Sequence, residues 1–298
     1  MNNFFSINGL TIFVYYLTHT LIIDIRNLTF GYSPKKLLYK NLNLQLPAGS
    51  IYGLLGRNGA GKSTLLKNMI GLLYPLKGSI TVNGFQPGKR SPSFLSTIYF
   101  IPEEVYVPAL TITRYVELFA VFYPLFNHEQ FNSYLLALDT LTNERLDRLS
   151  FGQQKKFIIA FGLACNTEIL LLDEPTNGLD IPSKKQFRKL IASVMNGDRM
   201  IFISTHQVRD LDNLIDQVII VDNGELIMNE PLSAVAEKLF FGIVERSNDY
   251  QEILYSENAL KGIAIVTKNT TGADSKINLE HLFNAATENA VMIKNIFK

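Results

Sequence analysis

The sequence IYGLLGRNGAGKSTLLKNM, residues 51–69, combines three features that belong to one kind of fold. Residues 51–55 form a continuous apolar run, which is typical of a strand buried on both faces of a parallel sheet. A glycine-rich turn follows, and residues 62–69 predict a helix that begins where the turn ends. This order of strand, turn and helix, with Gly-Lys-Ser at the junction, predicts a loop that binds phosphate groups.

The glycine-rich turn supplies the groups that a nucleotide triphosphate needs. Its three glycines let backbone amides turn inward around the β-phosphate, and the start of the helix adds partial positive charge. Lys62 is placed to bridge the β- and γ-phosphates, and the Ser63 hydroxyl to ligand Mg²⁺. A glycine-rich turn that binds no nucleotide would not require Gly-Lys-Ser. The candidate nucleotide-binding residues of this loop are Gly56, Asn58, Gly59, Ala60, Gly61, Lys62, Ser63 and Thr64.

A second motif, ILLLDEP at residues 169–175, is a predicted buried strand that ends in two carboxylates. Asp173 is expected to hold Mg²⁺ through its water shell, and Glu174 to orient or deprotonate the attacking water. The alternative is that the two acids cap the next helix, since carboxylates stabilise helix N-termini. Because the phosphate loop lies upstream, the motif indicates the Walker B pair of a hydrolytic nucleotide site.

The hydrophobic pattern around these motifs predicts an α/β fold with a P-loop NTPase core, a parallel sheet and an antiparallel β subdomain. Alternating side chains predict the antiparallel strands at residues 21–30 and 41–46. Further strand-like runs are predicted at residues 79–82, 169–172 and 200–204. A crossover helix is expected over residues 184–195.

The rest of the chain predicts a helical insertion and a small C-terminal α+β appendage. Apolar residues recur at helical spacing in the insertion, about residues 104–149. Asp222, Asn223 and Gly224 predict a hairpin turn. The expected division is an N-terminal extension (1–20), an ATPase domain (21–230) and the appendage (231–298). In the appendage we expect one strand, residues 262–267, and one amphipathic helix, which carries Leu279, Leu282, Phe283 and Ala286.

The run LSFGQQKK, residues 149–156, adds a third motif. With the two motifs above and with His206 in IFISTHQ, the chain resembles the ATP-binding subunits of ABC transporters over about residues 22–230. The resemblance implies that the protein binds and hydrolyses ATP with Mg²⁺. It also implies that two ATPase subunits, either two copies of this chain or this chain and a homologue, sandwich two ATP molecules, so that one subunit alone cannot complete a site.

The resemblance also implies roles for residues outside the phosphate loop. His206 corresponds to a histidine that touches the γ-phosphate, Asp180 to a loop that communicates between the two sites, and Tyr32 to an aromatic residue that stacks on adenine. Read without the resemblance, these three residues could be a structural histidine, a turn residue and a packed tyrosine. The residues that would contact the nucleotide of the partner subunit are Ser150, Gly152 and Gln153.

Two positions depart from the family pattern. Phe151 stands where the signature LSGGQ has its first glycine, which changes the surface toward the partner. Glu103, in IYFIPEE, stands where the family has a glutamine that contacts Mg²⁺ and the attacking water. A glutamate can still ligand Mg²⁺, although it adds negative charge near Glu174. A similar Pro-Glu-Glu variant occurs in many subunits of the ABC-2 exporter type, so we expect Glu103→Gln to keep measurable ATPase activity.

Composition excludes several other classes of protein. The chain has 28 Lys and Arg residues and 27 Asp and Glu residues, a net charge of 28 − 27 = +1. The protein therefore has no overall positive potential that would attract polyanions, and no nucleic-acid partner is expected. Apolar residues make up 47% of the chain, which is enough for a substantial core. The single cysteine, Cys165, lies in an apolar run and is expected to be a buried thiol in a reducing compartment.

Residues 1–23 contain no Asp, Glu, Lys or Arg, and three explanations compete. A secretory signal would need a positive n-region, which is absent. Residues 4–23 are just long enough to span a bilayer, but polar residues dilute the stretch. The favoured interpretation is an extension that packs on the domain or lies at a membrane surface.

The sequence therefore favours a peripheral ATPase subunit on the cytoplasmic face of the cell membrane, which drives a separate integral-membrane permease. The Pro-Glu-Glu variant and the short tail favour export over import. Residues 105–110 would contact the permease, or they belong to the core. One alternative is a soluble ABC-type ATPase of translation or DNA repair, although those usually carry two cassettes or a long coiled coil. Another is a nucleotide sensor without turnover, which the presence of Glu174 disfavours.

Overall fold

A computed structural model of the 298-residue chain describes residues 21–33, 35–140, 143–245 and 252–298. The expected N-terminal extension at residues 1–20 lies outside these ranges. The main sheet has six strands in the order β5-β6-β7-β3-β8-β9, of which only β9 is antiparallel to its neighbour. The strands are β3 (Ile51–Leu55), β5 (Ile98–Ile101), β6 (Ile169–Asp173), β7 (Met200–Thr205), β8 (Gln217–Asp222) and β9 (Glu225–Pro231).

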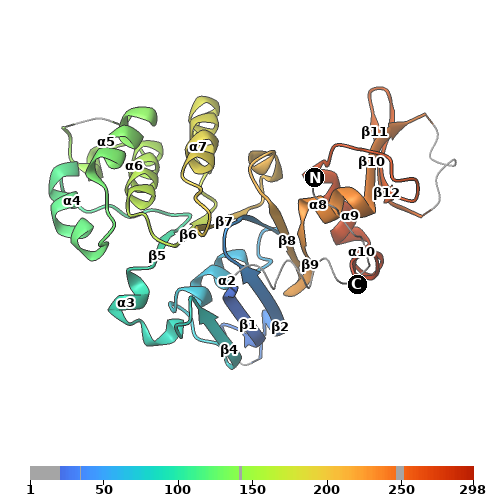
Figure 1. Cartoon of the computed structure of the whole chain (residues 1–298), viewed down its shortest axis with the longest axis horizontal. Coiled ribbons are helices and arrows are strands. Elements are labelled where there is room, and N and C mark those ends of the chain that lie inside the picture. Colours follow the sequence, from blue (N-terminus) through green and yellow to red (C-terminus); the bar gives the residue numbers. More distant parts are fainter. Residues whose placement is uncertain (1–20, 34, 141–142, 246–251) are drawn as a thin grey trace, which may run out of the picture.

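A second, antiparallel sheet lies beside the main sheet in the order β2-β1-β4 (Figure 1). Helix α2 (Lys62–Met69) packs between the two sheets, where its Leu65, Leu66 and Met69 are fully buried. The antiparallel strands confirm the predicted β subdomain, and the structure adds β4 to it as the third strand. The strands are β1 (Leu21–Phe30), β2 (Tyr39–Pro47) and β4 (Lys77–Val82).

The helical insertion packs on α6 (Phe151–Ala164) through a cluster of aromatic rings. Tyr115 contacts Phe157 and Phe161 edge-on at 5.0 and 5.1 Å between ring centroids. These rings anchor α6 against the insertion, which lies at one end of the molecule in Figure 1. The α-helices of the insertion are α4 (Ile112–Phe119) and α5 (His128–Ala137), whereas the short α3 (Pro92–Leu95) precedes β5.

The crossover helix α7 (Ile181–Ser193) begins three residues before the predicted start. Its first turn is capped by Asp180, whose Oδ1 accepts a hydrogen bond from Ser183 N at 2.9 Å. A proline near the helix start also favours this boundary, because its missing N–H is not needed there. Cys165 is buried, as its apolar surroundings predicted.

The C-terminal appendage is larger in secondary structure than predicted. It contains a three-stranded antiparallel sheet in the order β10-β12-β11, so the expectation of a single strand is wrong. Helix α9 contacts β8, β9 and the short 3₁₀ helix η4 (Val208–Leu211) of the ATPase core. The elements are α8 (Leu232–Lys238), β10 (Leu239–Val244), β11 (Ile253–Ala259), β12 (Gly262–Lys268), α9 (Leu279–Glu288) and α10 (Ala290–Ile296).

None of the helices in the described ranges is both long enough and apolar enough to cross a membrane.

Candidate functional site

The carboxyl ends of four parallel strands meet at one edge of the main sheet. Leu55 pairs with Thr205, Asp173 pairs with Ser204, and Ile101 lies opposite Leu172. Ligands of open parallel sheets bind outside this edge, because the loops that leave the strands converge there. The phosphate loop, Glu174, His206 and Glu103 all follow these strand ends and are therefore brought to one place.

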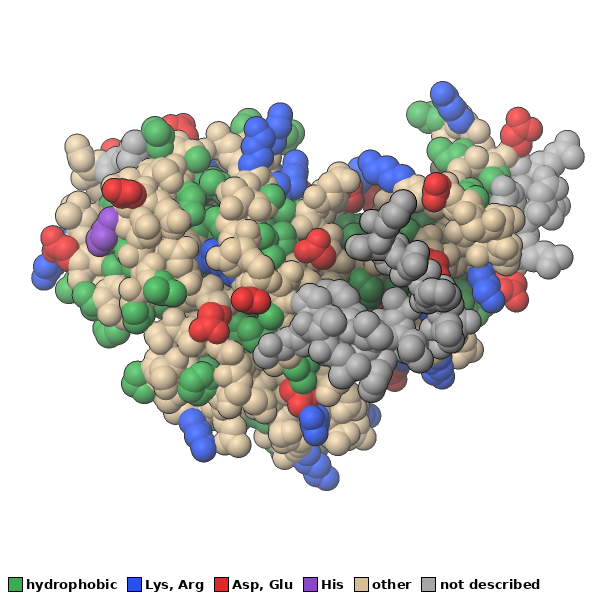
Figure 2. Space-filling view, in the orientation of Figure 1, with side chains coloured by type: hydrophobic (Ala, Val, Ile, Leu, Met, Phe, Trp, Pro, Cys, Tyr) green, Lys and Arg blue, Asp and Glu red, His purple; other side chains and the backbone are tan. Residues whose placement is uncertain are grey.

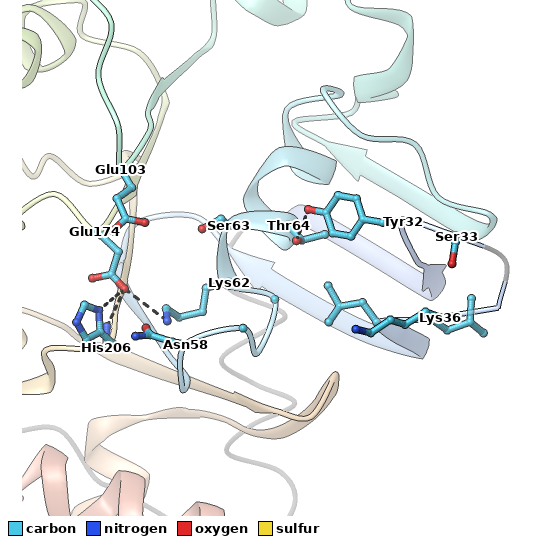
Figure 3. A pocket seen from close by; sticks show the side chains of 14 residues that line it. Tyr32, Ser33, Lys36, Asn58, Lys62, Ser63, Thr64, Glu103, Glu174 and His206 are labelled. Atoms are coloured by element: carbon cyan, nitrogen blue, oxygen red, sulfur yellow. Dashed lines mark hydrogen bonds and ion pairs between the residues drawn. The ribbon is translucent and has the colours of Figure 1, made fainter.

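A cavity of about 720 Å³ opens at this edge beside the phosphate loop (Figure 3). Its size is in the range of small-molecule and cofactor sites. The residues that line it are Tyr32, Ser33, Lys36, Leu37, Leu38, Asn58, Gly59, Gly61, Lys62, Ser63, Thr64, Glu103, Glu174 and His206. Ten of these fourteen are residues that the sequence nominated, and they come from both sheets.

The phosphate loop takes the backbone conformation that inward-facing amides require. Gly59 and Gly61 have φ angles of 80° and 107°, in the left-handed region where a side chain is strained. A Cβ on Gly61 would lie 2.3 Å from the Tyr39 hydroxyl oxygen. Tyr39 is fully buried and donates a hydrogen bond to Gly61 O at 2.7 Å, so it supports the loop from beneath.

Lys62 is buried at the bottom of the cavity, where its ammonium is held by oxygen atoms. Its Nζ donates to Gly56 O at 2.8 Å and lies 3.4 Å from Oε1 of Glu174. The lysine therefore bridges the phosphate loop and the end of β6. A triphosphate that enters the cavity competes with Glu174 for this ammonium, because both are anionic.

Glu174 is the most heavily engaged side chain of the site. Its carboxylate accepts hydrogen bonds from His206 N and from His206 Nδ1, each at 2.9 Å (Figure 3). It accepts a third from Thr205 Oγ1 at 3.0 Å. Since a carboxylate can only accept here, the proton of a neutral His206 is on Nδ1, and Nε2 is free for other contacts. Its backbone has a φ of 45°, an unfavourable value for a residue other than glycine. Strain of this kind is concentrated at functional sites.

Glu103 lies opposite Ser63 and lines the same cavity (Figure 3). Its Oε1 accepts a hydrogen bond from Asn177 Nδ2 at 3.0 Å. Asn177 in turn accepts from Gln207 Nε2 at 3.0 Å. The carboxylate is therefore fixed to the segment that follows Glu174 and to the segment that follows His206.

The oxygen donors at this edge suit Mg²⁺, which prefers carboxylate, hydroxyl and phosphate oxygens. Ser63 and Glu103 face the cavity, while Asp173 is buried behind it and accepts a hydrogen bond from Ser204 Oγ. Within the described ranges no three His, Cys, Asp or Glu residues cluster as a ready metal site.

Tyr32 stands at the far end of the cavity from Glu174. Its ring is 71% exposed, and its Oη shares a hydrogen bond with Thr64 Oγ1 at 2.9 Å. Phe30 packs edge-on against the ring at 5.3 Å and so fixes its plane. An exposed, oriented ring next to a phosphate loop can stack on a base.

The remaining nominated residues are absent from the cavity lining in the part of the chain that the structure describes. Gly56 supplies only its carbonyl to Lys62, Ala60 is buried, and the signature residues and Asp180 lie elsewhere. At the start of α6, Ser150 Oγ accepts from Gln153 N at 3.3 Å, and the Gln153 side chain accepts from Ser150 N at 3.0 Å. Ser150 is exposed in this capping box and does not line the cavity.

Comparison with known proteins shows which family has these features. The profile of the ABC transporter family matches residues 39–177. The ABC transporter ATP-binding protein NatA of Bacillus subtilis (strain 168) is 32% identical over 232 residues, which cover 76% of this chain and 92% of NatA. The chain belongs to the ABC transporter ATP-binding proteins. It is accordingly an ATP-binding, ATP-hydrolysing cassette, as the motifs indicated.

Other relatives of this ABC ATPase are named for different transported substances. The bacitracin transport ATP-binding protein BcrA of Bacillus licheniformis is 33% identical and covers 73% of this chain and 72% of BcrA. The high-affinity zinc uptake ATP-binding protein ZnuC of Bacillus subtilis is 31% identical and covers 68% of this chain and 92% of ZnuC. BcrA and ZnuC are therefore similar to this chain to about the same extent.

Solved structures agree with the fold of the ABC ATPase. A dimeric bacterial ABC transporter cassette superposes with a TM-score of 0.61 at 25% identity, covering 71% of this chain and 99% of the cassette. The ATP-binding subunit of another ABC transporter superposes with a TM-score of 0.64 at 24% identity, covering 72% and 91%.

Several residues of the ABC ATPase site were not found from the sequence. Thr205 and Asn177 hold Glu174 and Glu103, and Lys36 adds a cation to the cavity. Thr205 had a signal, because polar residues that end an apolar strand face the functional edge of a parallel sheet. The side-chain partners of Asn177, which are Glu103 and Gln207, are far away in the sequence. No local pattern marks Asn177 or Lys36.

Proposed function

We propose that the protein is the ATPase subunit of an exporter and that two copies enclose two MgATP molecules head to tail. One observation carries the dimer. Lys62, Glu174 and His206 line the cavity, whereas the exposed Ser150 of the capping box does not. A chain that holds two such complementary faces can complete its site only with a second chain, and closed symmetric pairs are the common solution.

In the proposed dimer, the phosphate loop binds the α-, β- and γ-phosphates through its amides and Lys62. The γ-phosphate displaces the ion pair between Lys62 and Glu174 and so frees this carboxylate to take a proton from water. His206 holds Glu174 through Nδ1 and presents Nε2 toward the γ-phosphate. Mg²⁺, held by Ser63, Glu103 and water bound to Asp173, would neutralise charge on the phosphates.

ATP stabilises the closed dimer because its γ-phosphate contacts both chains. A ligand shifts an equilibrium between open and closed states only by its different affinity for the two. Here that difference comes from Ser150 and the α6 amides of the partner copy. Hydrolysis removes the γ-phosphate, and the pair then relaxes toward the open state.

A permease-contact surface is proposed on the helical insertion. Figure 2 shows hydrophobic side chains at the molecular surface of this end. In the 105–110 segment, Tyr106 is 88% exposed whereas Val107 is buried, so only part of this segment is available for contact. Exposed apolar groups that gather in one region mark interaction sites. The exposed apolar residues of the insertion are Leu118, Phe119, Val121, Phe122, Leu125 and Leu136.

Export is the direction that we propose, and the cytoplasmic face of the membrane is the proposed location. The Pro-Glu-Glu sequence at residues 102–104 supports export. Similarity to an uptake protein such as ZnuC makes import the competing assignment. Co-purification of the tagged protein with an integral-membrane partner, followed by transport assays in vesicles of both orientations, distinguishes the two.

The composite site is tested by mixing two inactive variants. Lys62→Ala removes the phosphate-loop cation, and Ser150→Arg blocks the surface of the partner. Each variant alone is expected to be inactive, because every site lacks one of the two faces. A mixture contains pairs with one intact site, so about a quarter of the wild-type activity is expected for random pairing. If the mixture is as inactive as its components, the shared site is wrong.

A further inference from the structure

Lys155 is a fully buried lysine that the proposed mechanism does not use. It lies on α6, five residues after Ser150, and its side chain has no exposed surface. Its Nζ donates a hydrogen bond to Glu103 O at 2.6 Å and a longer one to Pro102 O at 3.3 Å. The ammonium is thus attached to the backbone of the loop that carries the Glu103 carboxylate.

Burying a charged ammonium costs free energy unless nearby groups compensate it. Burial lowers the pKa of Lys155 to about 8, while the negative charges of Glu103, Asp173 and Glu174 act in the opposite direction. A well-packed apolar side chain commonly replaces a buried charge without loss of stability. Stability alone therefore does not explain a lysine at this position, but its electrostatic attraction to the acids of the site does.

The bond from Lys155 also connects two segments that contact different nucleotides in the proposed dimer. Helix α6 begins at Ser150, which faces the nucleotide of the partner copy. Glu103 faces the nucleotide in the chain's own cavity. The first turns of α6 are rigid, because the capping box closes the helix start and the aromatic cluster anchors its middle. A displacement of α6 is therefore passed on to the Glu103 backbone.

We propose that Lys155 is a positioning residue that couples the Ser150 end of α6 to the Glu103 carboxylate. When Ser150 contacts the nucleotide of the partner copy, this coupling aligns Glu103 in the chain's own ATP site. This proposal rests on the proposed function, because only the dimer gives the two ends of the coupling their ligands. Asn177 complements the coupling, since it holds the side chain of Glu103 while Lys155 holds its backbone.

The first test separates positioning from binding and from folding. Lys155→Met keeps the length of the side chain but removes its charge and its donors. Because Lys155 does not line the cavity, we expect the KM for ATP to stay within about threefold while kcat falls about tenfold or more, a loss of about 1.4 kcal/mol of transition-state stabilisation. Lys189→Met, at an exposed lysine of α7, is the matched control and should leave both constants unchanged.

A fluorescent reporter follows the loop directly. The chain contains no tryptophan, so Tyr106→Trp places a single reporter three residues after Glu103, at an exposed position. In a Glu174→Gln background, ATP is expected to change the emission of this reporter. Adding Lys155→Met should abolish at least half of that change while the ATP-dependent dimer still forms.

The outcomes distinguish this inference from the proposed function. If Glu174→Gln itself never dimerises with ATP, the proposed function fails. The positioning role is wrong if Glu174→Gln dimerises and Lys155→Met changes neither measurement by more than twofold. These measurements are kcat in the otherwise wild-type protein and the Tyr106→Trp signal in the Glu174→Gln background. Loss of the dimer on adding Lys155→Met would also overturn the positioning role, because Lys155 would then act in association. Should Lys155→Met not fold, Lys155→Gln, which keeps one donor without charge, is judged by the same criteria.

Discussion

Glu230→Gln is expected to stabilise the protein at neutral and alkaline pH. Glu230 lies on β9, where it pairs with Val218, and it is mostly surrounded by protein. Desolvation by this burial raises the pKa of its carboxyl from 4.5 to about 7, and the nearby positive charge of Lys238 offsets only part of the effect. The folded state therefore holds a proton that the unfolded chain releases.

The sign and size of the effect follow from this difference. Between pH 4.5 and 7 the folded state binds more protons than the unfolded state, so the stability contributed by this group is present below pH 4.5 and is lost as the pH rises through 7. A shift from 4.5 to about 7 corresponds to about 3 kcal/mol at most. Because the side chain is partly exposed, screening by water reduces the expected value to about 1–2 kcal/mol.

Denaturant unfolding at pH 5 and at pH 8 measures this effect. Glu230→Gln should raise the free energy of unfolding by about 1–2 kcal/mol at pH 8 and by less than half of that at pH 5. Glu225→Gln is the matched control, because Glu225 is the exposed acid of the same strand. A gain that is equal at both pH values, or a variant that is less stable at pH 8, would refute the reasoning.

Three further predictions concern the site. Tyr39→Phe removes the hydrogen bond to Gly61 O, which should cost about 1 kcal/mol in unfolding experiments and weaken ATP binding several-fold in titrations; an unchanged variant would show that the loop does not depend on this bond. Gly178→Ala places a Cβ 2.7 Å from the Phe151 ring at a φ of 80°, so ATPase activity should fall about tenfold and recover in part when Phe151→Ala is added; no recovery would speak against this contact. Tyr32→Ala should raise the KM for ATP about 5- to 150-fold while Tyr32→Phe keeps it within about threefold, and equal effects of the two would exclude stacking.

Much of the core could be predicted because each element carries its own local signal. The strand β3, the loop after it and α2 are marked by an apolar run, glycines and Gly-Lys-Ser. The boundary of α7 was missed by three residues, since its cap at Asp180 and the following proline precede the amphipathic pattern. These signals are short-range, so they appear in one sequence.

The appendage was predicted less well because its strands depend on long-range pairing. β12 is buried over most of its length and has a clear apolar pattern. β10 contains a glycine and the exposed Ile243, and β11 is exposed along much of its length. Both are edge strands that pair with β12, and the sequence of an edge strand carries a weaker pattern than that of a central strand.

The site shows a similar division. The residues that we propose to bind phosphate and polarise water come from motifs, and the structure brings Lys62, Glu174 and His206 together. The residues that hold them in place, such as Asn177 and Lys155, act through contacts across 74 and 52 residues. Such contacts arise only when the parallel strands place their following loops side by side, which no local pattern reveals.

The shared site is tested most directly by the mass of the Glu174→Gln variant in solution. This substitution keeps the shape of the side chain but removes the proposed general base, so that ATP is bound without being hydrolysed. Light scattering on a sizing column should show the 33.6 kDa monomer without nucleotide and a species of twice this mass with ATP and Mg²⁺. A variant that binds ATP and remains at 33.6 kDa at every protein concentration would contradict the two-chain site.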